Sequence, residues 1–363
     1  MLTDQPARRG AVVALLSLED WDQVWRRNQH LATRLVGRGA VRELHFLEPP
    51  TLGRQSRPVR DPRPGVCAIP LGLRLPKRFG GLAELGGRLR RGVLRRADVL
   101  WINDPALGVH CLRRGQPAVY DVTDDWRSYD FPPRIIRRIE RAEDILARSA
   151  RTIVCSAELR DRWKERYGVE AAVVHNGVDM STWRAAEPRP YAGRAPHVGY
   201  VGTLEAARLD VDLVLRVADD ERVGTVHLVG PDALDARGRA LLTGHSKVVL
   251  HGAVPASEVA SWTKGLDVLL SPHLITPFTL SLDAIKSYEY LASGRPVVAT
   301  PTSGFHLLAA RPGVHVATGS SFVDAIDRAV SAPRPSAALD ELDWGARARE
   351  FAAQLLADHP VAR

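Results

Sequence analysis

Residues 281–300, SLDAIKSYEYLASGRPVVAT, change from one type of secondary structure to another at a glycine. The first part predicts a helix over residues 282–293, because its apolar side chains recur every three or four positions. Gly294 is suited to the helix end, and the apolar run 296–300 then predicts a buried strand. A helix followed at once by a buried strand is typical of a parallel sheet wound with helices.

The same alternation of short apolar runs and longer amphipathic runs continues on both sides of this stretch. The other predicted strands are residues 11–16, 41–47, 66–70, 98–102, 118–122, 151–155, 171–175, 197–202, 225–229, 247–250 and 267–271. Further helices are predicted near Val211 and at residues 256–264 and 321–331. The fold class is therefore α/β, with doubly wound parallel sheets.

The chain has 363 residues, which exceeds the roughly 250 to 300 at which single cores stop growing. Residues 176–195 are rich in Gly, Pro and polar residues, so the domain boundary is expected there. We predict an N-terminal domain over residues 1–180 and a C-terminal domain over residues 190–340. A final helix within residues 341–363 should bury one face, made of Trp344, Ala348, Phe351 and Leu355, on a domain that the sequence does not identify.

The composition, 45% hydrophobic and 25% charged, is that of a globular protein. Its three cysteines lack metal-ligand spacing and are expected to be buried free thiols in a reducing cytoplasm. The first apolar run is short, and acidic Glu19 and Asp20 follow it without a cleavage pattern, so it predicts a strand instead of a signal peptide. No apolar run approaches the roughly 18 to 20 residues that span a bilayer.

Positive charge is concentrated between Leu71 and Ala97, where eight basic residues oppose one glutamate. Such a segment suits an anionic acceptor or a membrane surface, although a solvated helix in an arginine-rich protein is the simpler interpretation. Peripheral membrane contact through residues 74–96, at the inner face, is one expectation. No nucleic-acid motif accompanies the charge, so no nucleic acid is expected.

Ligands of doubly wound sheets bind at the carboxyl ends of the strands and at helix N-termini. Ser281 and Asp283 are suited to the first turn of the predicted helix, whose free N–H groups suit a diphosphate. Lys286 can reach a phosphate oxygen, and Glu289 can accept hydrogen bonds from a diol such as ribose. No G-x-G-x-x-G follows the first strand, which disfavours a nicotinamide dehydrogenase.

Residues 281–300 resemble the donor-binding helix of GT-B glycosyltransferases of the large retaining family, which is family 4-like, in a bacterial subgroup. That helix usually carries an acid, seven residues and then a glutamate, followed by a Pro-Val-Val strand. Similar segments occur in the family's order at residues 21–35, 120–126, 175–179, 198–214, 227–231, 248–259 and 267–272. The resemblance implies the GT-B fold, two Rossmann-like domains facing a cleft, and transfer of a sugar from a nucleoside diphosphate sugar with retention.

The resemblance also implies roles for donor-binding residues. Glu289 matches the glutamate that holds the nucleotide ribose, Gly202 and Thr203 match a loop near the donor phosphates, and Arg208 matches a cation beside the diphosphate. Main-chain groups that grip the base correspond to Gly230, Pro231 and Val254. This chain has Ser281 where the family has its first acid, so Ser281 or Asp283 is expected to substitute, and the identity of the sugar stays open.

Three aspartates follow the predicted strand at residues 118–122. Asp121 and Asp125 are the candidate catalytic groups, because a carboxylate can stabilise positive charge on the anomeric carbon or act as a base. Asp124 is a candidate for acceptor binding. Capping of the helix that follows is the alternative role for these carboxylates. The two-domain layout disfavours the metal-binding Asp-x-Asp of GT-A enzymes, so no metal is predicted.

Acceptor contact is also expected from Trp21 and Arg27, which follow the first strand. Core packing of Trp21 on Trp25, four residues later, is the alternative. The family's flexible glycine pair is missing from this loop.

The sequence thus predicts a metal-independent glycosyltransferase that needs no cofactor besides its sugar-nucleotide co-substrate. The acceptor would be a small molecule, a glycan or a lipid-linked molecule. Two alternatives remain open, namely an epimerase or pseudo-glycosyltransferase that acts on nucleotide sugars, and a degenerate member that only binds.

Overall fold

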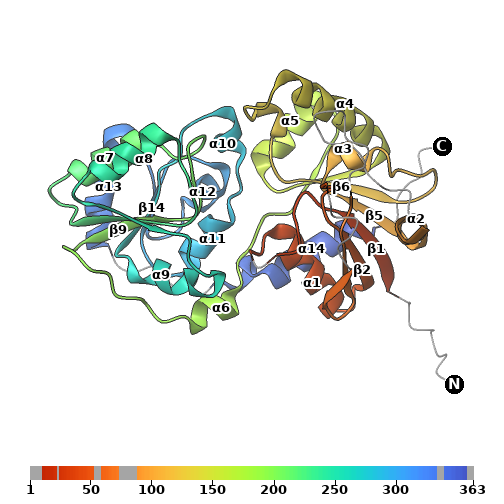
Figure 1. Cartoon of the computed structure of the whole chain (residues 1–363), viewed down its shortest axis with the longest axis horizontal. Coiled ribbons are helices and arrows are strands. Elements are labelled where there is room, and N and C mark those ends of the chain that lie inside the picture. Colours follow the sequence, from red (N-terminus) through yellow and green to blue (C-terminus); the bar gives the residue numbers. More distant parts are fainter. Residues whose placement is uncertain (1–9, 23, 53–58, 73–87, 333–338, 358–363) are drawn as a thin grey trace. The chain divides into compact units, whose positions relative to one another are not determined.

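The computed structural model describes residues 10–22, 24–52, 59–72, 88–332 and 339–357. The chain divides into two compact units, each built on its own parallel sheet (Figure 1). The first unit consists of Met1–Cys155, Leu159–Val174 and Trp344–Arg363, and the second of Ser156–Glu158 and His175–Asp343. These are two Rossmann-like α/β domains, as the alternating pattern predicts.

The first unit contains an eight-stranded sheet in the order β3-β4-β2-β1-β5-β6-β7-β8. Its strands are β1 (Ala11–Leu16), β2 (Val41–Leu47), β3 (Arg60–Arg63), β4 (Val66–Ile69), β5 (Val99–Ile102), β6 (Ala118–Val122), β7 (Arg151–Val154) and β8 (Ala172–Val173). All neighbouring strands run parallel except β3 and β4. The order reverses at β1, which pairs with β2 on one side and β5 on the other. Doubly wound sheets bind ligands beside such a reversal.

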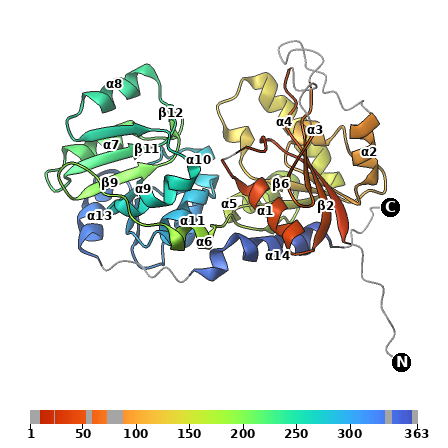
Figure 2. The ribbon, with the colours of Figure 1, turned by 60° about the horizontal axis from the view of Figure 1, so that its bottom comes forward.

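Helices cover both faces of this sheet. The helical elements are α1 (Arg27–Gly37), α2 (Arg88–Arg96), α3 (Pro105–Gly108), the 3-10 turn η3 (Trp126–Ser128), α4 (Pro133–Ser149), α5 (Ala157–Tyr167) and α14 (Trp344–Leu355). Helices α2, α3, α4 and α5 contribute to one core, which includes Leu146 and Trp163. On the other face, α14 lies along α1 (Figure 2), and Phe351 of α14 packs on Trp101 with ring centroids 4.6 Å apart. The final helix therefore packs on the first unit.

The second unit contains a six-stranded parallel sheet in the order β13-β11-β9-β14-β15-β16. Its strands are β9 (His197–Val201), β11 (Thr225–Val229), β13 (Val248–Gly252), β14 (Val268–Ser271), β15 (Val297–Ala299) and β16 (Val314–Val316), and a separate pair is formed by β10 (Leu204–Glu205) and β12 (Asp232–Ala233). All neighbouring strands of this sheet run parallel, and such strands need crossover connections, which the helices provide.

Helices also cover both faces of the second sheet (Figure 1). They are α6 (Met180–Ala185), α7 (Val211–Asp219), α8 (Ala236–Gly244), η4 (Ala256–Glu258), α9 (Val259–Gly265), α10 (Pro277–Ser281), α11 (Ile285–Ala292), α12 (Ser303–Leu308), α13 (Gly319–Ser331) and η5 (Asp340–Leu342). Helices α7, α8 and α13 bury their apolar faces on one side of the sheet, and α9, α11 and α12 on the other.

Residues 281–300 differ from the prediction at one point. In place of one helix over residues 282–293, α10 ends at Ser281 and α11 begins at Ile285. The prediction that Ser281 and Asp283 lie in the first turn of that helix is therefore wrong. Thr276 caps α10 and Pro277 begins it, and the extended backbone of Leu282 and Ala284 separates the two helices.

The basic segment falls largely outside the described residues, which omit residues 73–87. Its last part forms α2. Within the described part of the chain, no helix is both long and apolar enough to cross a bilayer. All three cysteines are free, with Cys111 and Cys155 buried and Cys67 half-buried.

Candidate functional site

Two glycines bring three strand ends of the second unit close together. Gly202 follows β9 and donates its N–H to the carbonyl of Val229 at 2.8 Å, while Gly230 follows β11 and donates to the carbonyl of Gly252 at 2.8 Å. Their φ angles are 148° and 144°, in the region that favours glycine. A Cβ atom on Gly230 would collide with the carbonyl oxygen of Gly202. Glycine is therefore required where these strand ends pack against each other.

Lys286, in the first turn of α11, points toward the first of these glycines. A Cβ atom on Gly202 would lie only 2.7 Å from its Nζ. The ammonium group donates to the hydroxyl of Tyr200 and lies 3.8 Å from the centroid of that ring. Burial lowers the pKa of Lys286 to about 7, and the positive charge of Arg208 acts in the same direction. An anion bound beside Gly202 would stabilise the charged form.

Glu289 lies one turn further along α11, three residues after Lys286, and so on the same side of the helix. Burial raises the pKa of Glu289 to about 7, although the charge of Lys286 opposes this shift. Among the residues that the structure describes, its carboxylate makes no hydrogen bond. A carboxylate so placed can accept hydrogen bonds from ligand hydroxyls.

Arg208 lies close enough to Lys286 for the two positive charges to interact. Its side chain pairs with Glu205, and its backbone carbonyl accepts a hydrogen bond from Leu274 N at 2.8 Å. Its positive charge helps to lower the pKa of Lys286 and of His273. The second unit thus gathers Arg208, Lys286 and Glu289, three of the residues predicted from sequence.

Sequence reasoning missed two residues here. His273 is 4% exposed, and burial holds its pKa well below the usual range, so its imidazole is neutral beside the two cations. Its Nδ1 lies 3.2 Å from Ser271 Oγ. Tyr200 accepts a hydrogen bond from Lys286, and its own hydroxyl donates to the carbonyl of Thr203 at 3.1 Å. The only sequence signal for either was its position near the end of a predicted strand.

The other residues predicted to bind the donor, Thr203, Pro231 and Val254, make backbone hydrogen bonds or apolar packing contacts within the unit. Thr203 and Pro231 have exposed side chains, and their carbonyls accept hydrogen bonds from Tyr200 and from Leu204 N, the latter at 2.9 Å. Val254 is half-buried and packs on the apolar cluster around Trp262. Main-chain groups at these positions are consistent with recognition that does not depend on side-chain identity.

The polar side chains of Ser281 and Asp283 are engaged within the unit. The hydroxyl of buried Ser281 donates to the carbonyl of Phe278 at 2.8 Å, which closes α10. The carboxylate of Asp283 accepts from Asn176 N and from the hydroxyl of Tyr288, both at 2.6 Å. These contacts position the start of α11.

Tyr290 fixes the other side of α11. Its buried hydroxyl accepts from Val201 N at 2.9 Å and lies 3.3 Å from the carbonyl of Leu270. The helix is therefore tied to the ends of β9 and β14, which holds Lys286 and Glu289 in place.

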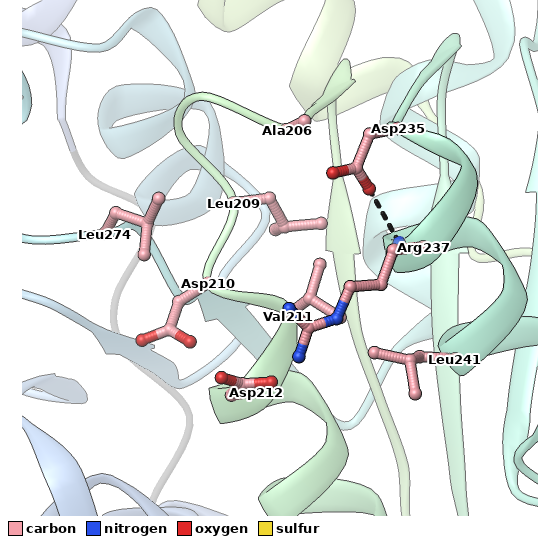
Figure 3. Close-up of a pocket in the computed structure, with 10 residues that line it drawn as sticks. Ala206, Leu209, Asp210, Val211, Asp212, Asp235, Arg237, Leu241 and Leu274 are labelled. Carbon is pink, nitrogen blue, oxygen red and sulfur yellow. Dashed lines mark hydrogen bonds between the residues drawn. The ribbon is translucent and has the colours of Figure 1, made fainter.

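A separate hollow of about 180 Å³ lies between α7 and α8 (Figure 3). Asp210 and Asp235, which line it, cap these two helices by accepting from Leu213 N at 2.8 Å and Gly238 N at 2.6 Å. Asp210 and Asp235 thus act as helix caps, and the hollow contains none of the residues predicted to bind the donor.

In the first unit, Asp121 and Arg27 form a buried ion pair. Arg27 begins α1, and its Nε and Nη2 both lie 3.0 Å from carboxylate oxygens of Asp121. The exposed fractions of the two side chains are 4% and 0%. This ion pair links α1 to β6, and each side chain uses its charged group to bind the other.

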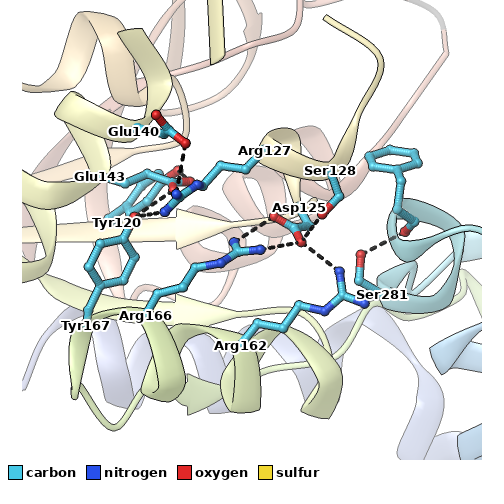
Figure 4. Close-up of polar contacts among 11 residues, drawn as sticks. Tyr120, Asp125, Arg127, Ser128, Glu140, Glu143, Arg162, Arg166, Tyr167 and Ser281 are labelled. Carbon is cyan, nitrogen blue, oxygen red and sulfur yellow. Dashed lines mark hydrogen bonds and ion pairs between the residues drawn. The ribbon is translucent and has the colours of Figure 1, made fainter. Parts of the chain in front are cut away.

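Asp125 forms the centre of a second network (Figure 4). Its carboxylate accepts from Arg166 at 2.7 and 2.8 Å, from Arg162 at 2.6 Å and from the hydroxyl of Ser128 at 2.7 Å. Burial opposes ionisation, but the hydrogen bonds from Arg166, Ser128 and Arg162 outweigh it and lower the pKa of Asp125 to about 2. A carboxylate with so low a pKa is a poor proton acceptor near neutral pH.

Glu19, just after β1, has the properties that a proton-transfer group needs. Its Oε2 is buried without a hydrogen-bond partner in the described part of the chain. Burial raises the pKa of Glu19 to about 7, opposed by Arg26 and reinforced by Asp124, Asp22 and Asp121. Sequence analysis used this residue only as evidence against a signal peptide. Asp124 is half-buried, and its negative charge helps to raise the pKa of Glu19.

Comparison with known proteins identifies this class of structure. Solved structures with the same fold include sucrose-phosphate synthase from Thermosynechococcus elongatus, with a TM-score of 0.64, 17% identity and coverage of 95% of this chain and 94% of that chain. They also include OtsA, with a TM-score of 0.69, 11% identity and coverage of 97% and 100%. HepE from Anabaena, in complex with UDP-glucose, has a TM-score of 0.60, 15% identity and 95% coverage of both chains. The two units together have the GT-B glycosyltransferase fold.

Sequence comparison adds the family. The model described as Glycosyltransferase Family 4 matches residues 24–182, and the one described as Glycosyl transferases group 1 matches residues 195–332. The putative teichuronic acid biosynthesis glycosyltransferase TuaH of Bacillus subtilis (strain 168) is 26% identical over 222 residues, which are 55% of this chain and 55% of the relative. The matched part thus spans about half the length of that relative. The chain belongs to the family 4-like GT-B glycosyltransferases.

Proposed function

We propose that the protein transfers a sugar from a nucleoside diphosphate sugar to an acceptor hydroxyl. The observation that carries this proposal is the arrangement of Lys286 and Glu289 on one side of α11. Lys286 lies next to Gly202, which with Gly230 forms what we call the glycine edge of the sheet. A cation in the first turn of a helix suits a diphosphate, because the helix N-terminus adds positive charge. A carboxylate one turn away that makes no hydrogen bond among the described residues suits a ribose diol. Family membership supports the same function.

In this proposal, the bond between the anomeric carbon and the diphosphate breaks while a bond to the acceptor oxygen forms. Lys286 and Arg208 stabilise the negative charge that develops on the leaving diphosphate. The acceptor hydroxyl loses its proton during transfer. We propose retention of the anomeric configuration, in which the departing diphosphate oxygen takes that proton, and neither a metal nor another cofactor.

The proposal is tested by thermal shift with UDP-, GDP-, ADP- and dTDP-sugars on the wild type and on Glu289→Ala. At least one donor should stabilise the wild type, and the variant should lose that stabilisation. Glu221→Ala, which removes an exposed carboxylate from the same unit, should keep it. Equal shifts in the wild type and Glu289→Ala would remove Glu289 from the donor site.

A second candidate is donor binding without transfer. It is favoured by Ser281, which stands at the position of the family's first acid and whose hydroxyl is engaged by Phe278. Release of nucleoside diphosphate separates the two functions. A donor that stabilises the fold but is never turned over, with any acceptor, would favour binding alone.

A further inference from the structure

A cavity of about 510 Å³ lies in the first unit, and donor binding does not account for it. Its walls come from the segment after β1, from the residue after β2 and from β3, and they include Trp21, Trp25, Glu48, Arg60 and Arg63. Strands β1 and β2 are neighbours, so the cavity opens at the carboxyl end of the sheet, close to the reversal of strand order. Its volume is within the range of small-molecule sites.

The cavity wall is held in shape by an ion pair between buried Glu48 and exposed Arg60. Glu48, 1% exposed, pairs with Arg60 and accepts from Trp21 N at 3.1 Å. Arg60 also donates to the carbonyl of Trp21 at 3.4 Å. The Trp21 ring packs edge-on against Phe46, with centroids 5.1 Å apart. Because the backbone and the ring of Trp21 are both fixed, the cavity exists before any ligand binds.

The lining combines an aromatic surface with planar charged groups. The Arg63 guanidinium lies 5.3 Å from the centroid of the Trp25 ring, and no carboxylate pairs with it among the described residues. Asp20 and Asp22 also line the cavity, and the Asp22 carboxylate lies 3.6 Å from the guanidinium of Arg26. An indole face can contact the C–H groups of a sugar ring, while guanidinium donors and carboxylate acceptors bind its hydroxyls. A lipid tail would need an apolar lining, which these charges do not provide.

We propose that this cavity binds a saccharide unit of the acceptor, with its ring against Trp25 and its hydroxyls bonded by Asp22 and Arg63. This inference rests on the proposed function, since it assigns the acceptor a chemical class. It extends the sequence-based prediction for Trp21, whose ring is packed in the wall, to Trp25 and Arg63, which offer the binding surface.

The test is saturation-transfer difference NMR with methyl glycosides of glucose, galactose, N-acetylglucosamine and glucuronic acid on the full chain. At least one glycoside should receive saturation from the wild type, and Trp25→Ala and Arg63→Ala should weaken its affinity at least tenfold. Trp25→Phe, which keeps an aromatic face, should retain part of it. Arg42→Ala, an exposed arginine at the opposite end of β2, is the matched control and should bind as the wild type does.

Donor-induced thermal stabilisation of each variant shows that it is folded, and it also separates the two proposals. If donor is bound and turned over but no glycoside binds, or if Trp25→Ala binds as tightly as the wild type, the saccharide inference is wrong and the proposed function stands. If no donor binds or is turned over, the proposed function fails, and binding of a glycoside at Trp25 would then define a saccharide-binding protein.

Discussion

The ammonium group of Lys286 lies 3.8 Å from the centroid of the Tyr200 ring, in the second unit. Burial holds the pKa of the Tyr200 phenol above its usual range, so the phenol stays protonated and carries no negative charge that would neutralise Lys286. With its own pKa near 7, Lys286 can gain or lose its charge near neutral pH. Donor binding should therefore be coupled to proton uptake.

The first prediction is that donor affinity falls as pH rises above 7. The free protein loses the Lys286 proton above a pKa of about 7, whereas a bound diphosphate favours the charged form and raises that pKa. The dissociation constant for the nucleoside diphosphate should rise between pH 7 and 9, by up to about tenfold per pH unit. Isothermal titration calorimetry in buffers of different ionisation enthalpy measures both the affinity and the protons taken up.

Lys286→Arg is the control for this effect. An arginine stays protonated throughout this range, so the variant should show weaker pH dependence and no proton uptake. Glu289, whose pKa burial also raises to about 7, titrates in the same range, so any pH dependence that Lys286→Arg retains is assigned to Glu289. A wild-type dissociation constant that does not change between pH 7 and 9 would contradict the role of Lys286.

A second prediction concerns the glycine edge. Gly230→Ala places a Cβ against the Gly202 carbonyl, at a φ of 144° that is unfavourable for alanine. The variant should lose about 2 kcal/mol of unfolding free energy and its donor-induced thermal shift. Gly244→Ala, where a Cβ meets nothing within 4 Å, should keep both. Urea denaturation measures the first quantity, and intact donor binding in Gly230→Ala would show that the edge is not part of the site.

The sheets were predictable because buried parallel strands are continuous apolar runs. Strands β1, β2, β6 and β11 have the predicted bounds to the residue. The buried face of α14, from Trp344 to Leu355, also follows the predicted spacing. Its location on the first unit was not predictable, because an apolar face specifies that it will be buried and leaves open which surface buries it.

The state of the carboxylates was not predictable either. Asp121, Asp125 and Asp283 look alike in the sequence, since each is an acid near the end of a strand or the start of a helix. Their partners Arg27, Arg166 and Asn176 lie 94, 41 and 107 residues away along the chain. The local pattern thus marks where polar groups gather, whereas long-range packing decides which of them are engaged.

The third prediction distinguishes a structural from a catalytic Asp125. Asp125→Asn should lower the unfolding free energy by about 3 kcal/mol, because it leaves Arg162 and Arg166 without their buried anion. The wild type should lose the same stabilisation as pH falls. A folded-state pKa of about 2 lies below the ordinary aspartate pKa of 3.8, so this contribution is present above pH 4 and lost as pH falls toward 2.

The matched control is Asp130→Asn, which changes an exposed aspartate of the same loop and should alter stability by less than about 0.5 kcal/mol. Urea denaturation of the three proteins at pH 7 gives the comparison. If Asp125→Asn unfolds as the wild type does but no longer releases nucleoside diphosphate, Asp125 is a catalytic group instead of a structural one.

The last prediction is that Glu19 destabilises the folded protein above neutral pH. Its folded-state pKa of about 7 lies above the ordinary glutamate pKa of 4.5, so the unfolded chain loses a proton between pH 4.5 and 7 that the folded chain keeps. Stability from this group is therefore complete below pH 4.5 and lost as pH rises through 7. Glu19→Gln keeps the shape without the charge, and it should be about 2 kcal/mol more stable than the wild type at pH 8.

At pH 4, where the carboxyl is protonated in both states, Glu19→Gln and the wild type should unfold alike. Glu165→Gln, an exposed change in the same unit, should match the wild type at both pH values. Urea denaturation at pH 4 and pH 8 provides the comparison. A difference between Glu19→Gln and the wild type that is the same at both pH values would mean that ionisation of Glu19 is not its cause. A destabilising carboxyl beside the reversal of strand order is typical of a functional group, because residues that serve function need not favour stability.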